Sequence, residues 1–247
     1  MIKRRNFLLI FFSFASTLIF PKSANASLIS TQEEIKIGRD ASKSFEKKYG
    51  LYDDPYWNEK VSSIGARLVA VCDRRDLPYT FKIVNINQIN AVSFPGGFIY
   101  VYKGLLNFVK SDDELACVLG HEIGHVCRRH VVKNIERQFY ANLFLQVLFS
   151  KSSSLSQYVA GLTENLVMLG YSRDEEYEAD HYGTIYAYRA GYNPCAMITF
   201  MERLKTVDKE NLGKAYEIFS DHPSTDDRIK RLQKLDEELG VQCNVTL

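Results

Sequence analysis

The chain has 247 residues, of which 46% are hydrophobic and 25% charged, and its formal net charge is +1. This near-neutral balance gives no indication of nucleic acid or another polyanion as a partner. The length suits one compact domain or two small ones, and it is sufficient to bury a full core.

The first 26 residues have the pattern of a secretory signal peptide. A basic start at Lys3–Arg5 precedes an apolar run from Phe7 to Phe20, and Ala24-Asn25-Ala26 has the small-x-small form of a signal-peptidase site. We therefore predict a signal peptide over 1–26 and an exported domain over 27–247. An uncleaved membrane anchor is the alternative, although the apolar run is short for a span.

Two helices and a strand are predicted next. The first helix begins at Ser30 and Thr31 and ends at Gly50, because hydroxyl residues favour helix starts and glycine favours helix stops. The second opens at Asp54-Pro55 and carries an apolar stripe of Val61, Ile64, Leu68 and Val71. A strand-like alternation follows over residues 80–86.

A second strand is predicted at Phe98–Tyr102, which is rich in aromatic and β-branched residues. The preceding Pro95-Gly96-Gly97 favours a bend or an edge position in a sheet. An edge strand can bind an extended peptide as an additional strand. The plainer alternative is a hairpin strand of a small sheet.

The centre of the sequence carries the motif H-E-x-x-H. A capping-box pattern at Ser111–Glu114 predicts the start of a helix. On that helix His121 and His125 lie one turn apart on the same face, where both can bind one zinc ion. Glu122 would stand beside the metal-bound water and take its proton. The alternative is a helix surface with two solvated histidines.

Two glycines and a third histidine surround this motif. Gly120 and Gly124 each cost about 1 kcal/mol relative to alanine inside a helix. We expect close packing to compensate, against the strand or the second helix. His130 lies five residues after His125, off its face, and is predicted to be a surface residue.

The run from Phe139 to Phe149 is apolar throughout and precedes the serine-rich stretch 151–156. Eleven residues cannot span a bilayer as a helix. Core packing is the favoured interpretation. Peripheral membrane contact or a lid over the site is the alternative.

A third metal ligand is expected on a helix that a capping box opens at Ser172. Glu176 and Asp180 share one face of this helix, so one can ligate while the other holds a histidine N–H. Their spacing does not decide which, and Glu175 and Glu178 lie on the same helix. Further helices are predicted from Asn193-Pro194 and over 225–239. The fold class is α+β, predominantly helical.

The five cysteines do not suggest a second metal site, because their number is odd and no C-x-x-C pair occurs. Cys195 can pair with Cys243, or either of these with Cys72, if the protein is exported. Cys117 is expected to pack as a small apolar residue.

Four segments resemble one family in order. They are Asn90-Ala91 with Pro95-Gly96-Gly97, the H-E-x-x-H motif, Ser172-Arg173 with Glu176 and Asp180, and His222-Pro223 with Arg228. The chain is similar here to the gluzincin metallopeptidases that include the HtpX, BepA-type, Oma-type and type I CAAX prenyl proteases. We expect a stand-alone exported protease domain, because the tetratricopeptide repeats of BepA-type members and the membrane spans of CAAX members are not seen.

The resemblance implies a zincin-like metallopeptidase fold, with a small β-sheet whose edge strand borders the active-site cleft. It implies one Zn²⁺ per chain, bound by His121, His125 and Glu176, with Glu122 as general base and Asp180 as support for a ligand histidine. It also implies that His222 and Arg228 assist catalysis. Polypeptides would be the substrates, held by Asn90, Gly96, Gly97, Phe98 and Tyr100.

These features predict a zinc metalloendopeptidase of extended or misfolded proteins, acting in envelope quality control in the periplasm. One alternative is a zinc-dependent, chaperone-like binding factor in which His222 or the segment around Ser152 fills the fourth zinc position. Another is a non-peptidase hydrolase, or a purely structural zinc site with Cys117 as fourth ligand, although structural sites favour cysteine-rich ligand sets.

Overall fold

The computed structural model describes residues 27–149, 170–206, 222 and 226–243. The predicted signal peptide and the serine-rich stretch lie outside these ranges. The described helices and strands, in chain order, are α1 Thr31–Tyr49, α2 Pro55–Val69, β1 Thr80–Val84, β2 Ala91–Phe94, β3 Phe98–Tyr102, α3 Lys103–Phe108, α4 Asp112–Cys127, α5 His130–Phe149, α7 Arg173–Arg189, α8 Ala196–Thr206 and α10 Asp226–Glu238. The fold is α+β and mainly helical, as predicted.

Local capping explains where the principal helices begin. Ser30 and Ser172 each accept a hydrogen bond from the backbone three residues on, and Glu33 and Glu175 return the bond. The capping box predicted for α7 is therefore present, and α1 has one as well. At α4 only half of the predicted capping box is present: Ser111 accepts from the backbone N–H of Glu114, whereas the Glu114 carboxylate accepts from the backbone N–H of Lys110. These three caps fix the starting positions of the helices that carry or support the candidate site.

The three described strands form one mixed sheet in the order β1-β3-β2. β3 pairs with β1 in parallel and with β2 antiparallel. The predicted edge position of Phe98–Tyr102 is therefore wrong, because hydrogen bonds to both neighbours make β3 the central strand. The sequence pattern did not reveal the central position of β3, because its parallel partner β1 is separated from it in the sequence by β2. β2, which packs against α4, is an edge strand of the described sheet.

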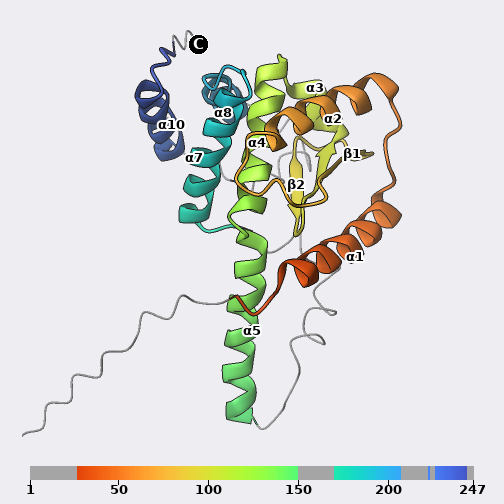
Figure 1. The fold of residues 1–247 in the computed structure, drawn as a ribbon. Helices are drawn as coiled ribbons and strands as arrows, with labels where there is room; N and C mark the ends of the chain where they lie inside the picture. The colour runs from red at the N-terminus through yellow and green to blue at the C-terminus, as the bar shows by residue number, and fades with distance from the viewer. Residues whose placement is uncertain (1–26, 150–169, 207–221, 223–225, 244–247) are drawn as a thin grey trace, which may run out of the picture.

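Both faces of β3 are buried, and they belong to different parts of the core. Ile99 and Val101 face the larger cluster, with apolar residues of α2, α4, α7 and α8. Phe98, Tyr100 and Tyr102 face the smaller cluster beneath α1, with Phe45. This alternation follows from the two-residue period of a strand. Figure 1 shows α4 running between the sheet and the helices α7, α8 and α10.

The two glycines of α4 pack against α7. A Cβ atom on Gly120 would lie 2.7 Å from the carbonyl oxygen of Gly183, and one on Gly124 would lie 2.9 Å from that of Ala179. The expectation of close packing is confirmed, but its partner is the helix predicted to carry the third ligand, rather than the strand or the second helix. The backbones of α4 and α7 can approach closely because neither has a large side chain at these points.

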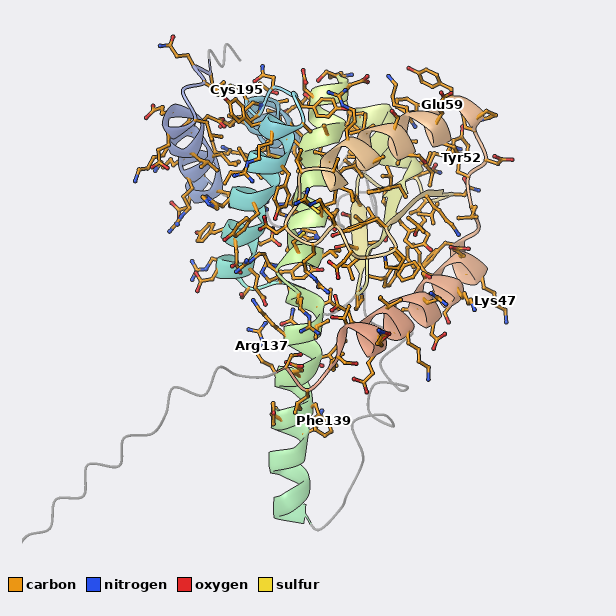
Figure 2. The ribbon with its side chains drawn as sticks, viewed as in Figure 1. Lys47, Tyr52, Glu59, Arg137, Phe139 and Cys195 are labelled. Atoms are coloured by element: carbon orange, nitrogen blue, oxygen red, sulfur yellow. A yellow bond between two sulfur atoms is a disulfide. The ribbon has the colours of Figure 1, made fainter. Side chains whose placement is uncertain are left out.

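Helix α5 corrects one prediction and bears on another. His130, its first residue, is fully buried rather than on the surface. The described beginning of the apolar run is not core, because Phe139 is only partly buried and Tyr140 is 53% exposed. Figure 2 shows Phe139 on the part of α5 that extends beyond the rest of the domain. No helix within the described ranges is long and apolar enough to cross a membrane.

One of the candidate cysteine pairings is present. Cys195 and Cys243 form a disulfide, with their Cα atoms 5.4 Å apart, which joins the chain before α8 to the chain after α10. Cys72, Cys117 and Cys127 are free and buried. The packing role predicted for Cys117 fits its burial among apolar residues of the larger cluster.

Candidate metal centre

The two motif histidines lie on the buried side of α4, 4% and 1% exposed. Because they are one helical turn apart, their rings project from the same face, and the Nε2 atoms of His121 and His125 are 3.0 Å apart. Burial is the main reason that the pKa of His125 is well below its usual value, and the ring is therefore neutral. A neutral imidazole is the form that binds a metal.

Glu176 reaches the same point from α7. Its carboxylate oxygens lie 3.4 Å from Nε2 of His125 and 3.6 Å from Nε2 of His121. Burial opposes its ionisation, but His222, His125 and His121 together hold the pKa of Glu176 well below its usual value. A charged carboxylate therefore faces the neutral ring of His125 and the neighbouring ring of His121.

The residues present fit a metal ion. Ligand atoms of His121, His125, Glu176 and His222 all lie within 4.8 Å of one another, and all four residues are buried. Imidazole nitrogen with one carboxylate is a donor set that suits zinc. Cys117 is not in this group, which argues against the structural site that would use it.

Asp180 and Arg228 form a buried layer behind the ligands. Oδ1 of Asp180 lies 3.0 Å from Nδ1 of His121, the ring nitrogen that points away from the cluster. Arg228 donates to both oxygens of Asp180, over 2.7 and 2.6 Å, and its Nη1 lies 2.8 Å from Glu176. Burial alone would raise the pKa of Asp180, but its contacts with Arg228 and His121 outweigh burial and lower that pKa. One arginine thus holds the supporting carboxylate and the ligand carboxylate together.

His222 lies between Glu176 and Glu122. Oε1 of Glu122 is 3.8 Å from Nε2 of His222, and Nδ1 of His222 is 2.8 Å from Glu176. Burial raises the pKa of Glu122, against the influence of His222 and His121. Burial lowers the pKa of His222, but Glu176 and Glu122 outweigh this and raise it to about 9. A carboxyl group with a raised pKa is suited to both accept and return a proton.

Sequence reasoning missed two residues beside the ligands. The ring of Tyr171 stacks on His125 with centroids 3.8 Å apart, and nearby Glu122 and Glu176 add to the burial that raises its pKa. Nδ1 of His130 lies 2.9 Å from Nδ1 of His125. Neither follows from helical spacing, since Tyr171 precedes its helix and His130 lies beyond the end of α4. The aromatic residue directly before the cap Ser172 was the available indication for Tyr171.

The five residues predicted to bind substrate lie in or beside the sheet. Asn90 is buried, and its side chain accepts from the backbone N–H of Ala91. Gly96 and Gly97 form the turn between β2 and β3 with positive φ, and the turn packs on α1 and Tyr79. Phe98 and Tyr100 face α1, and the Tyr100 hydroxyl donates to Glu46. These contacts hold the sheet against α1, so a role in binding substrate stays a prediction.

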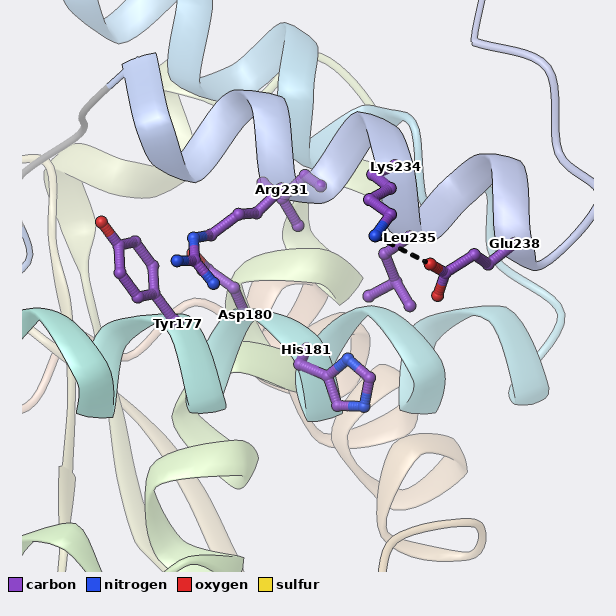
Figure 3. Close-up of a pocket in the computed structure, with 8 residues that line it drawn as sticks. Tyr177, Asp180, His181, Arg231, Lys234, Leu235 and Glu238 are labelled. Atoms are coloured by element: carbon purple, nitrogen blue, oxygen red, sulfur yellow. Dashed lines mark ion pairs between the residues drawn. The ribbon is translucent and has the colours of Figure 1, made fainter.

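A pocket lies behind the candidate centre, between α7 and α10. Asp180 borders it, together with Tyr177, His181 and Arg231. Figure 3 shows the Arg231 side chain beside Tyr177, and the guanidinium lies 4.0 Å from the ring centroid. This arrangement packs α10, which carries Arg228, against α7, which carries Glu176.

A buried cluster of two histidines and a glutamate from two helices, with a second glutamate beside it, is the arrangement of a zincin metallopeptidase. The model of peptidase family M48 matches residues 55–236. The chain belongs to this family.

Several curated proteins are similar to the chain. A beta-barrel assembly-enhancing protease of Yersinia pestis is 30% identical over 84% of the chain and 44% of its own length. The mitochondrial metalloendopeptidase OMA1 of Schizosaccharomyces pombe is 30% identical over 83% of the chain and 62% of its own. The metalloprotease LoiP of Escherichia coli is 31% identical over 63% of the chain and 62% of its own length. The chain spans less than half the length of the beta-barrel assembly-enhancing proteases that it matches.

Proposed function

We propose that this chain is a zinc-dependent metalloendopeptidase that cleaves peptide bonds in extended or misfolded proteins. The observation that carries the proposal is the convergence of His121, His125 and Glu176 on one point, with the buried carboxyl group of Glu122 beside it. Family membership and the names of the relatives support a protease, and they give no support to a purely binding factor.

His121, His125 and Glu176 would hold the zinc ion, which when bound acts as a Lewis acid and lowers the pKa of water. Glu122 would take the proton of the attacking water at a carboxylate oxygen and later give it to the leaving amine nitrogen. Its burial supports this cycle, because burial raises the pKa of Glu122 and so favours the protonated state through which the cycle passes.

His222 and Arg228 take different parts in this proposal. His222 is protonated at neutral pH in the metal-free protein, and its Nε2 faces Glu122, so it is placed to donate a hydrogen bond to a developing oxyanion. Arg228 donates to Asp180 and Glu176. We therefore assign Arg228 to positioning these carboxylates and assign the direct contact with substrate to His222.

An extended substrate would be held along β2. The sequence had favoured Phe98–Tyr102, which is β3, for this role. β2 is an edge strand of the described sheet and packs against α4, the helix of Glu122. An additional strand at such an edge is held by its main chain, which suits substrates of varied sequence. This supports unfolded or misfolded polypeptides as the substrate class.

We further propose that the protein acts in the periplasm in quality control of envelope proteins. Two observations support this: the signal-peptide pattern of residues 1–26 and the similarity to beta-barrel assembly-enhancing proteases. The disulfide between Cys195 and Cys243 is also consistent with an oxidising compartment.

The direct test is cleavage of an unfolded protein such as casein by the purified chain, before and after removal of metal with a chelator. We expect cleavage to stop when zinc is removed and to return when one equivalent per chain is added back. Cleavage that continues in the metal-free protein would contradict the proposal. So would zinc-loaded protein that leaves casein intact.

A further inference from the structure

His130 lies directly behind a candidate metal ligand. The Nε2 atom of His125 faces His121 and Glu176, so Nδ1 is the nitrogen that points away from the cluster. That atom is 2.9 Å from Nδ1 of His130, whose side chain has no exposed surface. Two imidazole nitrogens at this distance share one proton, and the remaining contacts of His130 decide which ring carries it.

Glu178 supplies the deciding contact. Its Oε2 lies 2.9 Å from Nε2 of His130, and its Oε1 accepts from Nε of Arg128 over 2.7 Å. Since an ionised carboxylate can only accept, His130 must carry its proton on Nε2. In a ring with one proton, Nδ1 of His130 is then an acceptor, and His125 donates to it from its own Nδ1. That leaves the lone pair of His125 Nε2 directed into the cluster.

We propose that His130 and Glu178 are positioning residues that fix the tautomer and ring orientation of His125 for metal binding. The inference rests on the metal site proposed above and adds to it. Asp180 stands in the equivalent relation to His121, since its Oδ1 lies 3.0 Å from Nδ1 of that ring. Each histidine ligand would thus be held by a carboxylate, directly for His121 and through an intervening imidazole for His125.

A purely structural role is the competing explanation. His130 is the first residue of α5 and follows Arg129, whose φ of 57° makes the turn between α4 and α5. Its hydrogen bonds could simply fasten the two helices together. Two substitutions of His130 distinguish the explanations. Asparagine presents an amide oxygen near the position of Nδ1, whereas leucine presents no acceptor there. The positioning role requires the acceptor, whereas loss of packing affects both variants.

The experiment measures zinc affinity by competition with a chromophoric chelator for the wild type, His130→Leu and His130→Asn. Removing an outer contact of a metal ligand typically weakens binding 10- to 100-fold. We expect a loss of about this size for leucine and a several-fold smaller loss for asparagine. The matched pair His181→Leu and His181→Asn, at an exposed histidine of α7, should bind zinc as the wild type does.

A second pair guards against a His130 variant that does not fold. Glu178→Leu, at a side chain that is 31% exposed, removes the carboxylate from His130. Arg128→Leu removes a second partner of that carboxylate and leaves Glu178 in contact with His130 and Lys133. We expect weaker zinc binding for Glu178→Leu and unchanged binding for Arg128→Leu.

Three results would overturn the inference: wild-type affinity in His130→Leu, equal losses for leucine and asparagine, or equal affinities in the Glu178 and Arg128 variants. In each of these the wild type still binds zinc, and the proposed function stands. A wild-type chain that bound no zinc would instead overturn the proposed function, and this inference with it.

Discussion

Gly183 of α7 lies directly against the backbone of His121 on α4, so that a Cβ atom at Gly183 would stand 2.6 Å from the His121 amide nitrogen. Such a separation is too short for any real side chain, and the neighbouring atoms are backbone. The close approach of the two helices is what lets the short side chain of Glu176 reach both histidines. The metal centre therefore depends on a glycine that contributes no ligand.

Gly183→Ala should destabilise the protein and weaken its zinc binding. Overpacking of this kind costs about 1–3 kcal/mol, whereas the helix propensity of alanine alone would stabilise by about 1 kcal/mol. Chemical denaturation of the metal-free protein measures the difference. Ala66→Gly, on the exposed face of α2, calibrates the propensity contribution. A more stable Gly183→Ala protein with unchanged zinc affinity would refute this account of the helix pair.

Glu176→Gln should release zinc under conditions in which the wild type retains it. The change removes the negative charge that faces Nε2 of both His121 and His125 while keeping nearly the same shape. Metal content after dialysis against a weak chelator is the measurement. Asp174→Asn, at an exposed position on the same helix, is the control and should keep its zinc. Equal metal content in the two variants would remove Glu176 from the ligand set.

Arg228→Leu should lower the free energy of unfolding by about 3–5 kcal/mol, because it removes the arginine cation from the buried carboxylate of Asp180 and one of the two cations beside Glu176. The exposed pair Lys234–Glu238, marked in Figure 3, provides the contrast. Its removal by Lys234→Leu should change stability by less than about 1 kcal/mol. Denaturant unfolding of both variants tests this, and similar small losses would show that Arg228 does not hold the site together.

Asp236 should make the protein less stable as the pH rises from about 4 to about 6. The residue is 1% exposed, and burial raises the pKa of its carboxyl group from 3.8 to about 6. Between those values the folded state binds more protons than the unfolded state, so raising the pH favours unfolding. A tenfold change in acidity corresponds to about 1.4 kcal/mol, which gives a penalty on the order of 1–3 kcal/mol at neutral pH.

Asp236→Asn should accordingly be more stable than the wild type at pH 7.5 by that amount, and the two should converge as the pH falls to 4. Urea unfolding at a series of pH values measures the difference. Glu237→Gln, at the exposed neighbouring position, should show no such pH-dependent difference from the wild type. A difference between Asp236→Asn and the wild type that stays constant with pH would exclude titration of Asp236 as the cause.

Features set by local chemistry could be predicted from sequence. The starts of α1, α4 and α7 follow from serine caps and the acidic residues of the first turn. The shared face of His121 and His125 follows from helical spacing alone. Spacing left Glu176 and Asp180 open as the third ligand, and the resemblance to a family assigned Glu176. In the structure Glu176 faces Nε2 of both histidines, whereas Asp180 faces Nδ1 of His121.

Features set by contacts between distant segments could not be predicted. β3 is central because it pairs in parallel with β1, although β2 lies between them in the sequence. No local pattern indicates such a pairing. His130 returns to His125 because the chain turns at Arg129 with positive φ, so helical spacing no longer applies beyond α4. Likewise, the packing partner of Gly120 lies 63 residues away in the sequence, at Gly183.

The central claim is that Glu122 moves the proton at a zinc ion held by its neighbours, and Glu122→Gln tests it most directly. Zinc content and casein cleavage should be measured on the same preparations of variant and wild type. We predict one zinc per chain in both, with cleavage by the variant reduced by at least about 100-fold, within the usual range for loss of a general base. A zinc-loaded Glu122→Gln protein that cleaves casein at the wild-type rate would contradict the account.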